Sequence, residues 1–243
     1  MTNSSLSIAS LRRALAQGWR VTRATRGVGT AYALVFTLGG LAIIGGLLAQ
    51  GWAPFVIAAA GAFMLVGPAM LAGFFGIADA FEAGEAVSLG CVGRGFARAS
   101  RALWALALVC ALLFMIFVTD AAILYAYMVG ATPVWLGKLL PASANMLAFV
   151  QWSAVSGLVV AFLLYCVAAF SVPLLCERRA GLVEAVVSSV RVVFGNFTVA
   201  ILWAILLATV VIGSVLLLPL LPLTLPWMAH ASRALYREAL PVA

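Results

Sequence analysis

Few side chains in this sequence have the type and spacing that chemistry requires. His230 is the only histidine among 243 residues, and one histidine cannot build a zinc site, which needs three or four protein ligands. The four cysteines form no C-x-x-C pair, so we expect buried or interfacial thiols and neither a disulfide framework nor a metal site; they are Cys91, Cys110, Cys166 and Cys176. With no Ser/His/Asp set, carboxylate-histidine cluster or phosphate-binding loop in view, the sequence predicts a protein that is not an enzyme and holds no cofactor.

Two polar side chains are candidates for a functional role within the apolar sequence. His230 is interpreted as an interfacial histidine with satisfied hydrogen bonds near the C-terminus of the last span, where its charge would stabilise the helix dipole. A single axial haem ligand is the alternative. Asp120 lies about 27 Å along a span that starts near residue 102, at 1.5 Å per residue. That depth is close to the outer hydrocarbon edge, so we expect a wetted carboxylate there and not a proton relay.

The composition excludes most soluble classes of protein. Apolar residues make 66% of the chain and charged residues 9%, whereas soluble domains have about 45–50% and 25%. This excludes a soluble enzyme, a disordered chain and a nucleic-acid module. The net charge of +7 comes from arginine patches between long apolar runs, a pattern typical of a membrane surface. We therefore expect membrane lipids as partners and no nucleic acid.

Charge-free runs place the membrane spans. One span needs about 20 residues, and charge-free runs cover 27–78, 102–119, 139–176 and 192–232. The first and last runs are long enough for two spans each. The predicted fold class is all-α, with 1–243 as a single transmembrane domain that begins with a basic amphipathic cytoplasmic segment at 1–30. Its six transmembrane helices are expected at about 32–49, 52–78, 102–127, 149–176, 197–215 and 217–236.

The positions of Lys and Arg set the predicted orientation. With six spans and both termini in the cytoplasm, 13 of the 14 Lys and Arg residues are cytoplasmic and only Lys138 is outside, as the positive-inside rule favours. A five-span alternative would put Arg233 and Arg237 outside as well. A cleaved signal peptide is not expected, because the apolar run begins only near residue 31 and is too long for a signal.

A short amphipathic segment precedes each predicted pair of spans. Leucine and arginine lie nine residues apart in all three, on opposite sides of a helix: Leu11 and Arg20, Leu89 and Arg98, Leu182 and Arg191. We expect three interfacial cytoplasmic helices with leucine in the acyl boundary and arginine facing phosphate and water. They either only orient the spans or form a platform for lipid or a partner. The candidate lipid or partner surface is the first segment, with Arg12, Arg13, Arg20, Arg23 and Arg26.

Small residues recur along the second predicted span. They let helices approach closely, so this ladder is either internal packing or a face for a partner's transmembrane helix. It comprises Gly61, Ala69, Ala72, Gly73 and Gly76. Three acids follow the span, Asp79, Glu82 and Glu85, and we expect them to pair with Arg94 and Arg98 across the surface at little gain in stability.

Four stretches resemble an uncharacterised family of predicted bacterial integral membrane proteins, a domain of unknown function. They are FMLVGPAMLAGFFGIADAFEAGE (63–85), AAILYAYM (121–128), FSVPLLCERRAGLVEAVVSSVRVV (170–193) and HASRALYRE (230–238). The resemblance covers about residues 10–240. The family ends in a Gly-His-Ala-Thr-Trp-His-Ala-Tyr-Arg-Asp-like motif. This chain keeps its His230, Ala231, Tyr236 and Arg237, with Arg233 in place of the Trp and Ala234 in place of the second His.

The resemblance implies a multi-pass protein of the bacterial inner membrane but supplies no established activity. Some members carry a label of cytochrome c oxidase subunit, which implies a respiratory setting. We therefore expect a non-catalytic accessory or structural subunit, or an assembly factor, of a larger membrane complex, with other membrane-protein subunits as partners. The alternative is a small-solute transporter or channel, which needs a polar path; the candidates for one are Gln151, Ser153, Ser156, Ser171 and Asp120.

Overall fold

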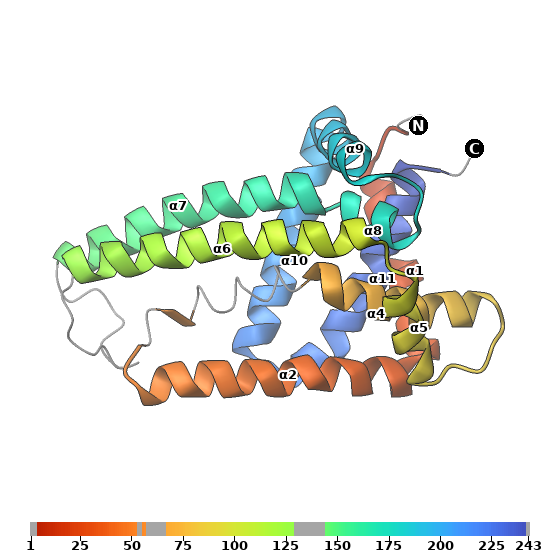
Figure 1. Ribbon diagram of the computed structural model, residues 1–243, viewed down its shortest axis with the longest axis horizontal. Coiled ribbons are helices and arrows are strands. Elements are labelled where there is room, and N and C mark those ends of the chain that lie inside the picture. Colours follow the sequence, from red (N-terminus) through yellow and green to blue (C-terminus); the bar gives the residue numbers. More distant parts are fainter. Residues whose placement is uncertain (1–3, 53–54, 57–66, 129–143, 242–243) are drawn as a thin grey trace.

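The computed structural model describes residues 4–52, 55–56, 67–128 and 144–241, and helices dominate this part of the chain (Figure 1). The all-α prediction is therefore confirmed for it. In chain order the helices are α1 (Ile8–Ala24), α2 (Arg26–Ala49), α4 (Gly67–Glu82), α5 (Gly90–Arg98), α6 (Arg101–Met128), α7 (Ala144–Ala168), α8 (Ser171–Cys176), α9 (Leu182–Gly195), α10 (Phe197–Leu216), the short 3-10 turn η2 (Leu218–Leu220) and α11 (Leu221–Ala239).

Within the described residues, four helices are long and apolar enough to cross a membrane: Arg26–Ala49, Arg101–Met128, Leu147–Cys176 and Phe197–Leu216. They coincide with the first, third, fourth and fifth predicted spans, although the first begins six residues earlier than expected. The second predicted span runs through residues 57–66, which lie outside the described residues, and α4 covers its end. The sixth becomes η2 and α11, and α11 is not among these four helices.

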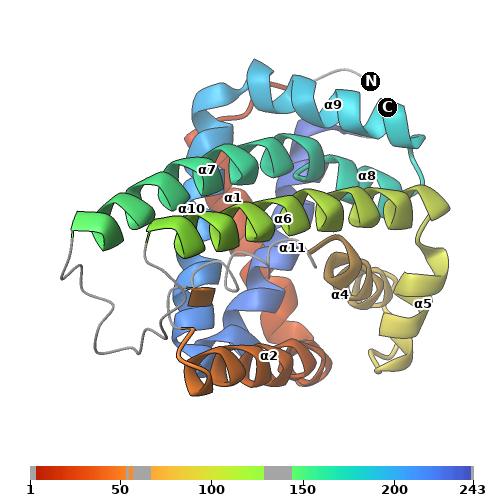
Figure 2. The ribbon, with the colours of Figure 1, turned by 60° about the vertical axis from the view of Figure 1, so that its left-hand side comes forward.

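The long helices take two directions. Helices α2, α6 and α7 follow the long axis of the molecule, whereas α1, α10 and α11 run across it in both views (Figures 1 and 2). The turn between α10 and α11 reaches α2, because Val215 and Leu221 share a hydrophobic cluster with Tyr32 and Ala33. The last helical hairpin therefore packs across α2 and is steeply inclined to it.

Each of the three predicted short segments forms a helix directly before a long one. The breaks between short and long helix lie at Thr25, at residues 99–100 and at Asn196. The short helices dock in a cyclic order: α1 packs chiefly along α11, α5 along α4, and α9 against α7 and α8. We call α2 with α4, α6 with α7 and α8, and α10 with α11 the first, second and third hairpins. Each hairpin receives the short helix that precedes the next one, and the first short helix docks on the third hairpin, so the three hairpins close into a ring.

Equivalent positions in the three helix pairs are buried. Adding 74 to a residue number in the first helix pair gives the equivalent position in the second pair, and adding 171 gives the one in the third. Four such sets are buried throughout: Gly18, Val92 and Ser189; Val21, Gly95 and Val192; Gly29, Leu103 and Ala200; and Tyr32, Leu106 and Trp203. The shift of 171 is the one that the leucine and arginine pattern predicts between the first and third segments. The second pair differs from the predicted register by four residues, about one helical turn.

The docking contacts are close because small residues meet there. A Cβ on Gly18 would lie 2.6 Å from the backbone nitrogen of Ala231, and a Cβ on Gly95 would lie 2.2 Å from the carbonyl oxygen of Ala72. In the third pair, the Ser189 hydroxyl donates to the Cys166 carbonyl at 2.7 Å. The apolar side of α1 is used in this way: Leu11 is buried and Leu15 packs on the core. The expectation that Leu11 lies in the acyl boundary is therefore wrong.

The two ends of the chain lie together (Figure 1). The Ser4 amide donates to the Ala239 carbonyl at 3.1 Å, and the Leu6 amide donates to the Asn196 side chain at 2.7 Å. Arg13 pairs with Glu238. The N- and C-terminal segments are therefore on the same side of the protein.

Candidate functional site

The most extensive polar cluster surrounds Arg233, whose side chain is only 4% exposed. Its Nη2 donates to Asp79 Oδ1 and lies 3.6 Å from Glu82 Oε2. Its Nε lies 3.4 Å from Glu177 Oε1. One buried guanidinium therefore faces carboxylates from α4 and from the turn after α8, which offsets the cost of burying its charge.

Arg237 completes the cluster one helical turn later. It donates to both carboxylate oxygens of Glu82, at 3.0 and 2.9 Å, and to Glu177 at 3.1 Å. Arg233 and Arg237 are four residues apart, and the two acids on α4, Asp79 and Glu82, are three apart, so each pair shares one helix face. We call Asp79, Glu82, Glu177, Arg233 and Arg237 the arginine hub.

A strained turn positions Glu177. Arg178 has φ = 53°, the left-handed conformation that usually takes glycine. Two backbone hydrogen bonds close the turn. The Arg178 amide donates to the Leu175 carbonyl at 3.3 Å and the Arg179 amide donates to the Leu174 carbonyl at 3.0 Å, the pattern of a Schellman motif. Arg178 also donates to the Arg98 carbonyl at 2.6 Å. The residue with the strained backbone therefore also connects the turn to the end of α5 through its side chain.

Arg179 and Tyr236 extend the hub toward the C-terminus. The Tyr236 hydroxyl donates to Glu177 at 3.2 Å, and Arg179 donates to the Tyr236 oxygen at 2.7 Å. Arg179 also donates to the carbonyls of Leu240 and Pro241 at 2.8 and 3.1 Å. Leu240 and Pro241 are therefore fastened to the turn after α8.

His230 lies one turn before Arg233 and departs from the prediction. It is 3% exposed, it is nine residues before the end of α11, and neither ring nitrogen has a hydrogen-bond partner among the described residues. The ring packs edge-on against Phe74 and lines a cavity of about 10 Å³ together with Gln17 and Glu82. That is about the room of one water molecule. The interpretation as a satisfied, interfacial histidine at a helix C-terminus is therefore wrong.

The hub joins charges that sequence reasoning did not bring together. Glu85 pairs with Arg94 at 2.9 Å as expected, and Arg98 lies 3.8 Å from Asp79. The buried partner of Asp79, however, is Arg233. The sequence did contain one signal for the hub, since Asp79 and Glu82 share one helix face and Arg233 and Arg237 share another. Nothing in the sequence, however, indicates that α4 and α11 meet.

The hub is suited to holding helices together. Each of its carboxylates contacts at least one guanidinium, and an arginine side chain does not release its proton in proteins. The arrangement therefore acts chemically as a lock between α4, α8 and α11, which belong to three different hairpins.

The predicted small-residue ladder faces the interior of the chain. A Cβ on Gly73 would lie 2.5 Å from the Tyr32 ring, and one on Gly76 would lie 2.3 Å from the Cys91 carbonyl. Ala72 is buried and Ala69 is partly buried, while Gly61 lies outside the described residues. The contacts at Ala72, Gly73 and Gly76 are thus internal packing of α4 against α2 and α5, which corrects the expectation of a docking face for a partner there.

The predicted basic surface is exposed. Its five arginines, Arg12, Arg13, Arg20, Arg23 and Arg26, all lie on the outside of α1 or at the first residue of α2. Arg13 alone of these contacts an acid among the described residues, Glu238. Asp120 is exposed on α6.

The cysteines are dispersed. Cys91, Cys110 and Cys166 are buried and Cys176 is partly buried, all as free thiols. Hydrogen bonds to the Cys91 sulfur, first from the Ser88 amide and then from Arg94, lower the pKa of this thiol. Among the described residues, no three His, Cys, Asp or Glu side chains gather in a way that could hold a metal ion.

The helical fold, the apolar spans and the charges gathered at one end define an integral membrane protein. The chain belongs to the family described as predicted integral membrane protein (DUF2189), whose family model matches residues 55–177. The match includes three hub acids, Asp79, Glu82 and Glu177, and ends before the two hub arginines. Searches of the curated proteins and of the solved structures find no match.

Proposed function

We propose that this protein is a non-catalytic accessory or structural subunit, or an assembly factor, of a larger membrane complex. The supporting observation is the division of its polar and apolar groups. The arginine hub is occupied by contacts within the chain, whereas the long helices present apolar side chains outward. Leu38 on α2, Ile116 on α6 and Leu158 on α7 are 63%, 65% and 72% exposed. Such faces contact lipid or the helices of a neighbouring subunit.

The proposed location is the bacterial inner membrane, with six crossings and both termini in the cytoplasm. The contact between Ser4 and Ala239 supports an even number of crossings, since it holds both ends on one side. The placement of Lys and Arg supports the cytoplasmic side. Because α10 and α11 run across α2, the proposed last two crossings are strongly inclined to the first one.

Site-specific cross-linking tests the accessory role. A photoreactive residue at Leu38, Ile116 or Leu158 should form an adduct with one stoichiometric membrane protein in intact cells. The matched control is the same residue at Phe74, which is fully buried and should form none. A protein that stays alone in mild detergent and moves a solute across liposome membranes would instead establish the transporter alternative. In that case the accessory role is wrong.

Engineered cysteines test the crossings. A cysteine at Lys138 should react with an impermeant maleimide from outside, and one at Arg191 only after permeabilisation. A cysteine at Leu218 in η2 should also react from outside if α10 and α11 cross. Protection of Leu218 from both sides would show that this hairpin enters and leaves on the same side. A C-terminal alkaline phosphatase fusion that is active would establish the five-span alternative.

A further inference from the structure

Helix α1 has one face inside the protein and one outside. The inner face packs on α11 and comprises Ser10, Leu11, Ala14, Gly18, Val21 and Thr22. The outer face carries Arg12, Arg20 and Arg23, which are all exposed. At about 100° per residue these three fall within an arc of about 80°, with the small Ala16 between them. Because Arg12 and Arg23 are about 16 Å apart along the helix axis, the three guanidinium groups form a basic strip along one side of α1.

This arginine face is not neutralised by the protein itself. The first acidic residue in the sequence is Asp79, so neither α1 nor α2 contains one. Among the ion pairs of the described residues, the acid that reaches α1 is Glu238, and it binds Arg13 at the edge of this face. The three arginines are free to bind an external anion.

The face lies at the expected membrane boundary. Only Thr25 separates α1 from α2, the first candidate span. Because α1 runs across α2 (Figures 1 and 2), it does not extend along that span. Trp19 and Ile8, 41% and 59% exposed, flank Arg12 on the same side of the helix. Tryptophan beside arginine is typical of the headgroup region.

We propose that Arg12, Arg20 and Arg23 form a basic strip that binds the phosphates of anionic phospholipids, with Trp19 and Ile8 against the glycerol and upper acyl region of these lipids. Guanidinium groups bind phosphate oxygens through paired hydrogen bonds, and the apolar edge selects a lipid over a free phosphate. The site rests on the cytoplasmic placement of the N-terminus proposed above and does not depend on the accessory role.

Native mass spectrometry of the full-length protein, released from detergent, tests the site. We expect phosphatidylglycerol to bind more tightly than phosphatidylcholine of the same acyl chains. Each basic residue near an anionic surface contributes about five-fold in affinity, so R12Q/R23Q should weaken phosphatidylglycerol binding by about twenty-five-fold. R12K/R23K should retain most of the preference.

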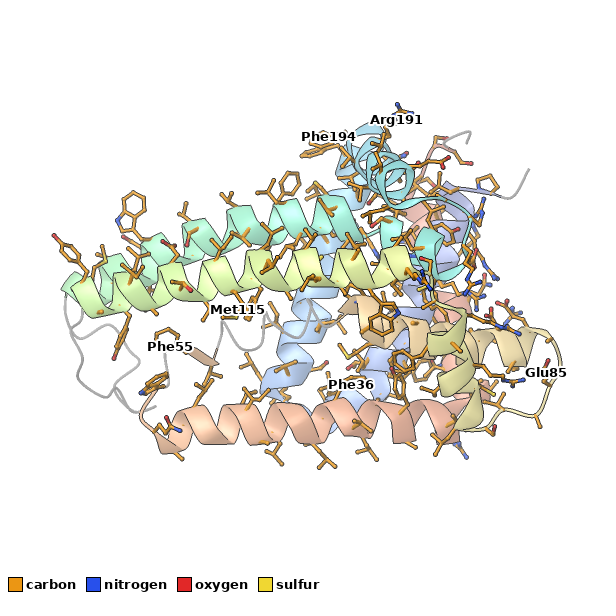
Figure 3. All side chains as sticks on the ribbon, viewed as in Figure 1. Phe36, Phe55, Glu85, Met115, Arg191 and Phe194 are labelled. Carbon is orange, nitrogen blue, oxygen red and sulfur yellow. The ribbon has the colours of Figure 1, made fainter. Side chains whose placement is uncertain are left out.

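The matched control is R101Q/R191Q, which removes the same charge from exposed positions outside α1. Arg191 points away from the body of the protein on α9, beside Phe194 (Figure 3). The control should leave phosphatidylglycerol binding nearly unchanged. Thermal stability in detergent should be equal in both double variants, because all four side chains are exposed. If R12Q/R23Q fails to fold, R20Q alone should still give about a five-fold loss.

Three outcomes would overturn the proposal. They are equal binding of the two lipids by the wild-type protein, an equal loss in the test and control variants, and displacement of phosphatidylglycerol by equimolar glycerol 3-phosphate, which would indicate a site for a soluble phosphate. If the cysteine labelling keeps its expected pattern, any of these outcomes refutes the lipid site alone.

Discussion

Arg233 and Asp79 are 154 residues apart in the sequence, yet the Arg233 guanidinium donates directly to the Asp79 carboxylate. The pair joins α11 of the third hairpin to α4 of the first. Arg233 also reaches Glu177 of the second hairpin. One side chain therefore bridges all three hairpins, which makes it the residue on which the closure of the ring depends most.

Replacing Arg233 should destabilise the protein strongly. In Arg233→Gln the partly buried Glu177 and the two acids of α4 lose their buried cation, and breaking such a pair costs about 3–5 kcal/mol. The control is Arg98→Gln, which also removes a cation near Asp79 but from an exposed position; we expect a loss below about 1 kcal/mol. Thermal unfolding in detergent measures both. Equal losses would show that the hub contributes no more than a surface ion pair.

Gly76 of α4 should tolerate no side chain. In Gly76→Ala the new Cβ would lie 2.3 Å from the Cys91 carbonyl oxygen and 2.8 Å from the backbone of Gly95. Because backbone atoms cannot rotate away, α5 must shift, at a cost of about 1–3 kcal/mol or more. Gly45→Ala on α2 is the control, since nothing lies within 4 Å of its Cβ. It should gain up to about 1 kcal/mol in helix propensity.

The readout for these two variants is the melting temperature of the isolated protein beside retention of any partner on blue-native gels. Lower stability in Gly76→Ala agrees with internal packing. Loss of the partner with the melting temperature unchanged would restore the ladder as a docking face and contradict the contacts described above.

The helical segments could be predicted from the sequence, but the contacts between them could not. Charge-free runs locate helices because a span must be apolar along its whole length, and α6 and α10 match their predicted bounds within a residue. The register of the first and third short helices was also visible, as the pairing of Leu11 with Leu182 shows. Such local signals depend only on residues that are close in the chain.

The arginine hub could not be predicted because its members come from three hairpins. The sequence predicted Arg94 and Arg98 as partners of the α4 acids, and only the packing of α11 on α4 brings Arg233 to Asp79. His230 was misplaced for the same reason. Its burial comes from α1 and α4, whereas its position in the sequence indicated only the end of a span.

Acid should weaken the junction between the two ends of the chain. The hydrogen bond from Arg13, with a smaller contribution from Ser10, lowers the pKa of Glu238 below its ordinary value. A carboxyl group whose pKa is lower in the folded state stabilises that state above its unfolded pKa, which is about 4.3. The stabilisation is lost as the pH falls through the lower folded pKa.

The corresponding measurement is the melting temperature from pH 7 down to pH 3. The difference between wild type and Glu238→Gln should be constant at neutral pH and should shrink below about pH 4. In an Arg13→Gln background, which removes the main cause of the shift, the same difference should be smaller at neutral pH. A difference that grows toward low pH would contradict the assigned direction.

The closed ring of hairpins predicts that the chain can be cut and rejoined. Because Ser4 and Ala239 are hydrogen-bonded, a short Gly/Ser linker can connect the natural ends. New ends between Glu85 and Val87 would fall in the loop between α4 and α5, which Figure 3 shows at Glu85 at the edge of the molecule. In this permutant α5 must dock on α4 without a covalent link, as α1 does on α11 in the natural chain.

We expect the permutant to insert, to keep the external labelling of a cysteine at Lys138 and to melt within a few degrees of the natural chain. Its first span, α6, follows Arg94, Arg98 and Arg101, so the positive-inside rule still sets the same orientation. The control permutant begins at Phe75 within α4, where the cut separates Gly73 from the hub acids; it should not fold. If both permutants fold equally well, or if both fail, closure by docked short helices is not what holds the three hairpins together.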